Sequence, residues 1–114
     1  TGLAYYPLAG PGERFPINDP AYPPRLEPRP ADDLIFFQAI LEGITAIEKS
    51  GYDRLAELGG PSVLSIRTVG GGAANIGWAR MRENALGVPF LASRSAEASV
   101  GAASLVLAGK ARWP

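Results

Sequence analysis

The stretch VLSIRTVGGGAANIGWARMRENAL, residues 63–86, decides the fold of this chain. Residues 63–69 carry apolar side chains on both faces of an extended segment, which predicts a strand covered on both sides, as in parallel sheets. Glycines follow at 70–72, and we predict a helix from about Asn75 to Leu86 with Asn75 as its N-cap. A strand that leads through glycines into a helix is typical of phosphate-binding loops, because backbone amides remain accessible there. A tight turn that needs positive φ angles is the alternative interpretation.

The segments on either side extend this pattern. Upstream, Asp32 or Asp33 is predicted to cap a helix that ends at Gly51, followed by a short second helix over 52–58. The apolar positions of the first helix recur at three- and four-residue spacing: Phe37, Ile40, Leu41, Ile44 and Ile47. Downstream, we expect a strand over 88–91 and a last helix, capped by Ser95, to about residue 108. Alternating strands and helices predict an α/β fold.

Proline divides the chain into two parts. Eight of the 11 prolines lie in the first thirty residues: Pro7, Pro11, Pro16, Pro20, Pro23, Pro24, Pro28 and Pro30. Proline fixes φ and lacks a backbone donor, so this segment forms neither a regular helix nor a central strand. Because it also carries many apolar side chains, we predict an ordered Pro-rich segment over 1–30 and a second segment over 31–114. A flexible linker is the alternative.

Composition limits the possible functions. The chain has 114 residues, 11 Lys and Arg against 11 Asp and Glu, and no His or Cys. Zero net charge disfavours binding to nucleic acid or to an anionic membrane surface. The missing His and Cys exclude common zinc sites, thiol nucleophiles and His-based triads, so we expect no metal site. No apolar stretch approaches the ~20 residues that span a bilayer, and we expect a soluble, cytoplasmic domain.

Two further features concern contacts. Gly43 lies in the middle of a predicted helix, where glycine costs about 1 kcal/mol relative to Ala, so a backbone or a ligand is expected to pass close to it. Tyr5, Tyr6 and Phe15 are predicted to lie on an exposed face that invites self-association, which makes a homodimer possible.

Read together, these segments resemble the C-terminal part of the FGGY family of carbohydrate kinases, and are most similar to its xylulokinase-like and D-ribulose-kinase-like members. The motifs that carry the resemblance span about residues 1–108: Tyr6-Pro7-Leu8, Gly12-Glu13-Arg14, Pro16, Asp19-Pro20, the helix ILEGITAIE, the loop TVGGGAAN followed by Trp78, the segment GVPF, and Glu97-Ala98 with Gly101-Ala102-Ala103.

The resemblance implies a fold and a site. Family members have two ribonuclease H-like domains of the actin and hexokinase superfold, with ATP and sugar in the cleft between them. Carried over by position, Gly71, Gly72 and Ala73 would lie along the ATP phosphates, and Asn75 would lie near the adenosine. Residues Glu13 and Arg14, as an ion pair, and Gly43 would form a scaffold of the cleft wall.

The resemblance also implies a reaction: transfer of the ATP γ-phosphoryl group to a sugar hydroxyl, with Mg²⁺ as cofactor and a pentulose such as D-ribulose or D-xylulose as acceptor. In the family the catalytic Asp lies upstream of everything present here. This chain would therefore hold no catalytic residue, supply only the ATP-binding wall, and be inactive alone. One alternative is a noncatalytic domain of the same superfold that binds a nucleotide or a protein. Another, an unrelated doubly wound domain, is disfavoured because Glu97 is the only acid in the region where a ribose contact is expected.

Overall fold

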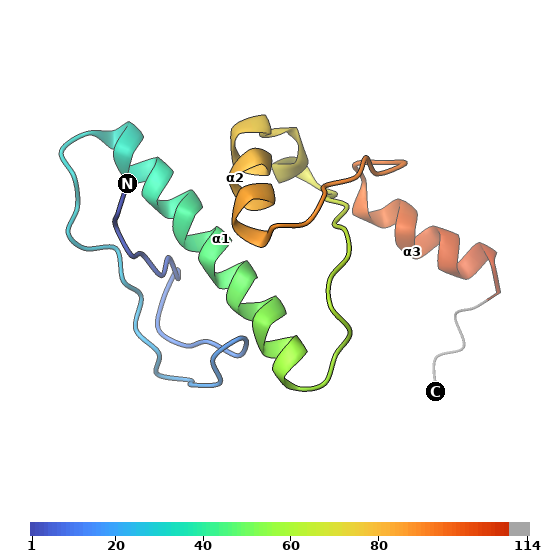
Figure 1. Cartoon of the computed structure of the whole chain (residues 1–114), viewed down its shortest axis with the longest axis horizontal. Helices are drawn as coiled ribbons and strands as arrows, with labels where there is room; N and C mark the ends of the chain where they lie inside the picture. Colours follow the sequence, from blue (N-terminus) through green and yellow to red (C-terminus); the bar gives the residue numbers. More distant parts are fainter. Residues whose placement is uncertain (110–114) are drawn as a thin grey trace.

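The computed structural model describes residues 1–109, the side chain of Ala98 excepted, so the last five residues of the predicted second segment lie outside the description. The described part contains helix α1 (Asp33–Glu57), a short 3-10 helix η1 (Gly71–Ala74), α2 (Ile76–Leu86) and α3 (Ala98–Leu107). The long helix α1 lies in the middle, with the N-terminal segment along one side and α2 against the other, while α3 projects away (Figure 1). No helix in the described range is long and apolar enough to cross a membrane.

Helix α1 is one continuous helix. Its N-cap is Asp32, as predicted, and the Asp32 carboxylate accepts a hydrogen bond from the Leu34 amide at 2.8 Å. The predicted end at Gly51 and the separate helix over 52–58 are wrong, because α1 runs through Gly51 to Glu57. The Phe15 ring explains the glycine: a Cβ at Gly51 would lie 3.0 Å from Phe15 Cε1. Gly51 therefore admits an aromatic ring to the helix surface and does not end the helix.

The buried face of α1 consists of small residues. Its buried positions are Ala39, Gly43, Thr45 and Gly51, whereas Phe37, predicted as part of the apolar stripe, is 55% exposed. At Gly43 an added Cβ would lie 2.8 Å from the Tyr5 carbonyl oxygen, so a neighbouring backbone does pass close there, as expected. The backbone of the N-terminal segment therefore lies directly on α1 at Gly43, where a larger side chain would not fit.

The two predicted strands are absent from the described residues. The stretches 63–69 and 88–91 are joined by a single parallel bridge between Ile66 and Phe90. Two hydrogen bonds make it, from the Ile66 amide to Pro89 O (3.0 Å) and from the Leu91 amide to Ile66 O (2.8 Å). The bridge is parallel, but each stretch has only one partner, and a two-stranded pair is marginal by itself, so the described residues do not show the sheet that the predicted α/β fold requires.

Helix α2 begins where predicted and α3 does not. The Asn75 side chain caps α2 by accepting from the Trp78 amide at 2.9 Å, and Gly87 ends α2 in the left-handed conformation. Helix α3 has Glu97 as its N-cap residue, and the predicted cap, Ser95, accepts from the Glu97 amide at 3.1 Å instead. Ser95 thus shapes the turn that leads into α3.

The N-terminal segment is folded onto α1 through its aromatic residues. Tyr5 is 3% and Tyr6 8% exposed, so the prediction that both lie on an open face is wrong, whereas Phe15 is 46% exposed. The Tyr5 hydroxyl donates to Pro28 O at 2.6 Å, and Tyr6 exchanges two backbone hydrogen bonds with Arg25. These bonds tie the two ends of the segment together, which buries both tyrosine rings.

Candidate functional site

The glycine loop, residues 70–75, connects the bridged segment to α2. Gly70 has φ 86° and ψ −179°, a conformation that L side chains rarely adopt, and its amide donates to Ala96 O at 2.5 Å. The chain then tightens into η1, where the Ala73 amide donates to Gly70 O (3.1 Å) and the Asn75 amide donates to Gly72 O (3.2 Å). The loop is thus a defined turn with its own hydrogen bonds.

Two amides of this loop remain open. The N–H groups of Gly71 and Gly72 donate to no backbone acceptor within residues 1–109, and as the first residues of a 3-10 helix they have none inside it. An added Cβ on Gly71 would meet nothing within 4 Å. The space on the Cβ side of Gly71 is therefore free of protein atoms.

A cavity of about 330 Å³ adjoins the loop. Gly72 and Ala73 form one side of it, and the remaining lining comes from Thr68, Ala79, Arg82 and residues 90–93. Its volume lies at the lower end of the ~300–1,000 Å³ typical of ligand sites. The cavity and the two open amides together make the glycine loop the candidate binding site.

The Trp78 ring packs against the backbone of the glycine loop. A Cβ on Gly72 would lie 2.7 Å from Trp78 Cζ3, so Gly72 is needed for the ring to pack against the loop backbone. The Trp78 indole donates to Thr45 Oγ1 on α1 at 3.0 Å, and this hydroxyl donates to Leu41 O at 2.8 Å. The ring is thereby fixed between α1 and the loop.

Arg82 makes a second connection, between α1 and the segment that precedes the glycine loop. It is 8% exposed; its Nε and Nη2 each lie 2.6 Å from a carboxylate oxygen of Glu48, and its Nη1 donates to Thr68 Oγ1 at 2.8 Å. The hydrogen bonds that Arg82 donates to the Glu48 carboxylate raise the pKa of Arg82, which therefore stays charged. We call Thr45, Glu48, Thr68, Trp78 and Arg82 the polar seam.

Most of the polar seam was not predicted from the sequence. Its members are far apart in the sequence, and a charged residue on a helix usually faces solvent. One signal was present: Glu48 follows Leu41 by seven residues and Ile44 by four, so a carboxylate continues the apolar stripe of α1. Arg82 likewise follows Trp78 by four residues, and both face α1.

The residues predicted as cleft-wall scaffold lie in the N-terminal segment and on α1, and none of them lines the cavity beside the loop. The expected ion pair of Glu13 with Arg14 is not formed in the described structure. Glu13 instead accepts from the Arg14 amide (2.8 Å) and from the Tyr6 hydroxyl (3.0 Å). Its role here is to hold a turn, because its carboxylate is occupied by donors of its own segment.

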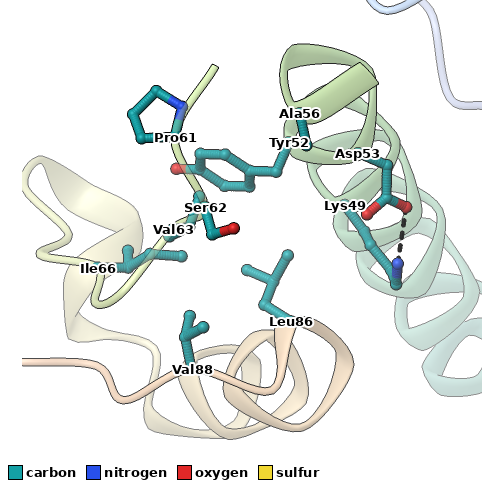
Figure 2. Close-up of a pocket in the computed structure, with 10 residues that line it drawn as sticks. All are labelled: Lys49, Tyr52, Asp53, Ala56, Pro61, Ser62, Val63, Ile66, Leu86 and Val88. Carbon is teal, nitrogen blue, oxygen red and sulfur yellow. Dashed lines mark hydrogen bonds and ion pairs between the residues drawn. The ribbon is translucent and has the colours of Figure 1, made fainter. Parts of the chain in front are cut away.

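A second cavity, of about 200 Å³, lies between the C-terminal half of α1, residues 61–66 and the end of α2. Figure 2 shows the Tyr52 ring, Leu86 and Val88 around it, with the exposed pair Lys49–Asp53 (2.7 Å) at its edge. No buried side-chain polar atom in the described range lacks a hydrogen-bond partner. Since this cavity is smaller than usual ligand sites, we regard it as a packing gap.

A magnesium ion does not fit the residues of the loop cavity. Mg²⁺ prefers carboxylate and phosphate oxygens, and the cavity lining contains no carboxylate. In the described part of the chain, no three Asp, Glu, His or Cys side chains are grouped so that they could hold a metal.

Comparison with known proteins adds one finding to this geometry. The family model described as the FGGY family of carbohydrate kinases, C-terminal domain, matches residues 1–109. The match includes the N-terminal segment, α1, the glycine loop, α2 and α3, and thus every residue of the candidate site.

Proposed function

The chain belongs to the FGGY family of carbohydrate kinases, matching its C-terminal domain, and from this membership we propose that it supplies the ATP-binding wall of a sugar kinase. In this proposal the complete protein transfers the γ-phosphoryl group of ATP to a hydroxyl of a sugar. The polyphosphate of the nucleotide binds at the glycine loop, and the acceptor sugar binds outside the described cavity.

The open amides of Gly71 and Gly72 are the observation that carries the proposal. Backbone N–H groups without protein acceptors, next to a cavity and at the start of a helix, are suited to bind phosphate oxygens. The cation that lines the loop cavity, Arg82, is already paired with Glu48 at 2.6 Å. Attraction of the phosphates at this wall therefore depends on the backbone.

Each predicted site residue has a role in this proposal. Gly71 and Gly72 donate to phosphate oxygens through their amides, while Ala73, whose amide is used within the loop, forms the adjoining wall. Asn75 uses its side-chain oxygen to cap α2, which leaves its amino group for the adenosine. Residues Glu13, Arg14 and Gly43 shape the N-terminal segment and its contact with α1.

The finer points of the proposal rest on the resemblance to xylulokinase-like and D-ribulose-kinase-like members. We propose a pentulose as the acceptor and the cytoplasm as the location. Transfer of the phosphoryl group depends on positioning and on neutralising charge, with a carboxylate accepting the hydroxyl proton. No carboxylate lines the loop cavity, so we assign no catalytic step to the described residues. A noncatalytic nucleotide-binding domain of the same superfold is the alternative.

The variant Gly71→Ala in the complete protein tests the proposal. The new methyl group meets no protein atom within 4 Å, so the fold tolerates it, but it adds bulk beside an amide that would donate to a phosphate oxygen. We expect the KM for ATP to rise about 10-fold or more, as for the loss of a hydrogen bond to a charged group, with the melting temperature unchanged.

Gly10→Ala is the matched control, because an added Cβ at Gly10 also meets nothing within 4 Å and lies in the N-terminal segment. We expect this variant to keep the wild-type KM for ATP. Equal ATP kinetics for Gly71→Ala, Gly10→Ala and the wild type would contradict the proposal.

A further inference from the structure

We infer that the polar seam is a positioning device that holds the glycine loop in the shape that binds the nucleotide, an inference that rests on the function proposed above. Thr68 and Arg82 line the loop cavity, but their polar groups bond to each other and to Glu48, so we assign them no contact with the phosphates. The residues of the seam act through the loop backbone, so they are positioning residues.

The seam reaches the loop from both sides. On the C-terminal side, the Trp78 ring packs under Gly72 and is fixed to Thr45 of α1 by the indole hydrogen bond (3.0 Å). On the N-terminal side, Arg82 donates to Thr68, two residues before Gly70 (2.8 Å). Since the Gly70 amide is bound to Ala96 O, the loop is held before, at and after its open amides.

The arginine is the central member because its donors bind two partners. Nε and Nη2 form a bidentate pair with Glu48, and Nη1 reaches Thr68 in a different segment of the chain. The fork geometry of a guanidinium fixes these directions relative to one another, which a lysine would not do. The position of Thr68 is thereby set by α1.

Stability alone does not require such an arrangement. Replacing a buried ion pair with apolar residues of similar volume is often neutral or stabilising, so a pair of apolar side chains would join α1 to α2 equally well. Apolar side chains could not hold Thr68 as well, because its hydroxyl needs a donor in a fixed direction, which Arg82 supplies beside its two donors to Glu48. The hydrogen bond to Thr68 therefore separates a positioning role from a purely structural one.

The consequence is specific to nucleotide binding. A loop held in one shape binds ATP without first ordering, and a loosened loop must lose entropy on binding. We expect loss of the Thr68 bond to raise the KM for ATP and to leave kcat and the KM for the sugar unchanged, since the bound geometry is the same.

The test compares Thr68→Val with Thr68→Ser in the complete protein. Valine removes the acceptor for Arg82 Nη1 and keeps the volume, while serine keeps the hydroxyl. The double variant Glu48→Leu/Arg82→Met removes the whole charged pair without leaving one charge buried alone. Arg54→Met, which breaks a surface pair with both side chains more than half exposed, is the control.

Two measurements are made on each variant. The first, without nucleotide, is hydrogen exchange of the Ala73 and Asn75 amides, which donate within the loop. We expect exchange about 10-fold faster in Thr68→Val and in the double variant, and wild-type rates in Thr68→Ser and Arg54→Met. The second is kinetics, where the same two variants should raise the KM for ATP about 3- to 10-fold.

Unchanged exchange in both Thr68→Val and the double variant would overturn the inference. Faster exchange with an unchanged KM for ATP would overturn it as well, because the seam would then not act on nucleotide binding. Gly71→Ala separates the two proposals: if it raises the KM for ATP while the seam variants do not, only this inference fails. If none of the variants alters ATP kinetics, the proposed function fails too.

Discussion

Glu13 shows how one side chain organises the N-terminal segment. Its two carboxylate oxygens accept from the Arg14 amide (2.8 Å), the Phe15 amide (3.4 Å) and the Tyr6 hydroxyl (3.0 Å). The hydrogen bond from the Arg14 amide holds the pKa of the Glu13 carboxyl below its usual value. Burial and the bond to Glu13 raise the pKa of Tyr6 from 10.0 to about 12. Glu13 thus stabilises the neutral, protonated form of Tyr6, and the Tyr6 hydroxyl stabilises the ionised form of Glu13.

This pairing predicts a loss of stability at high pH. The pKa of Tyr6 in the folded state lies above the unfolded value, so its contribution is complete below pH 10 and is lost as the pH rises through about 12. We expect the free energy of unfolding of the wild type to fall more steeply over this interval than that of Tyr6→Phe, measured by urea unfolding at each pH.

Tyr52→Phe is the control for that experiment, since within residues 1–109 the Tyr52 hydroxyl makes none of the side-chain hydrogen bonds found for Tyr5 and Tyr6. Tyr6→Phe should reduce the pH dependence of the wild type more than Tyr52→Phe does. Parallel curves for Tyr6→Phe and the wild type between pH 10 and pH 12 would show that Tyr6 is not held as a neutral phenol.

Residue patterns with local causes were predictable from sequence. Asp32 and Asn75 cap their helices as expected, because a cap depends on a side chain and an amide only two or three residues away. The partners of Glu13 and Arg82 were not predictable in this way. Arg82 meets Glu48 across 34 residues and Thr68 across 14, distances over which no sequence periodicity operates.

At the scale of elements, α1 lies between the N-terminal segment and α2 and packs against both. Its Gly43 and Gly51 allow close contact with the N-terminal segment, and its Thr45 and Glu48 form hydrogen bonds with side chains of α2. Figure 1 shows these two neighbours on opposite sides of the helix. We therefore expect a substitution at Gly43 or Gly51 to change the stability of the protein, and a substitution at Thr45 or Glu48 to change the conformation of the glycine loop.

Gly43→Ala should destabilise the protein although Ala is the better helix former. Helix propensity would gain about 1 kcal/mol, but the new Cβ would lie 2.8 Å from the Tyr5 carbonyl oxygen and 3.0 Å from Pro7 Cδ. A backbone carbonyl cannot move as a flexible side chain does, and overpacking costs about 1–3 kcal/mol. We expect a lower melting temperature in thermal unfolding.

Gly77→Ala in α2 is the matched control, because its Cβ would meet only Asn75 Oδ1, at an ordinary 3.5 Å. That variant should be as stable as the wild type or up to about 1 kcal/mol more stable. A stabilised Gly43→Ala would mean that the N-terminal segment does not pack on α1 as described.

The element predictions failed where the cause was non-local. Gly51 resembles a helix end in sequence, yet Phe15 of the N-terminal segment packs on it and the helix continues. Residues 63–69 have a strand pattern, but strand formation depends on partners along their length, and only Ile66 is paired. Helix α2 was predicted well because its cap and its left-handed Gly87 end are encoded within it.

The whole molecule is open and elongated. Its accessible surface is 8338 Å², against ~6,000 Å² expected for a folded monomer of 12.0 kDa. Its radius of gyration is 16.5 Å, where ~13 Å is typical for this length. Leu64 and Leu107 are more than 80% exposed. The described residues therefore leave much apolar surface exposed.

Because no carboxylate lines the cavity beside the glycine loop, we predict that the isolated 114-residue chain does not phosphorylate sugars. During transfer the sugar hydroxyl must lie in line with the γ-phosphoryl group and within hydrogen-bond reach of a base, and no Asp or Glu lines the cavity beside the loop proposed to hold the phosphates. A coupled assay with ATP, Mg²⁺ and D-ribulose or D-xylulose should give the rate of a protein-free sample. Sustained turnover by this chain would show that the catalytic group lies within it.

The most direct test of the account is an NMR titration of the ¹⁵N-labelled chain, which observes the Gly71 and Gly72 amides themselves. We predict that ATP and inorganic triphosphate shift both amide signals in a saturable manner and that adenosine does not, because the loop binds the phosphates. If adenosine alone reproduces the shifts, or if both signals stay unmoved while ATP shifts amides elsewhere in the chain, the glycine loop is not the phosphate site and the account is wrong.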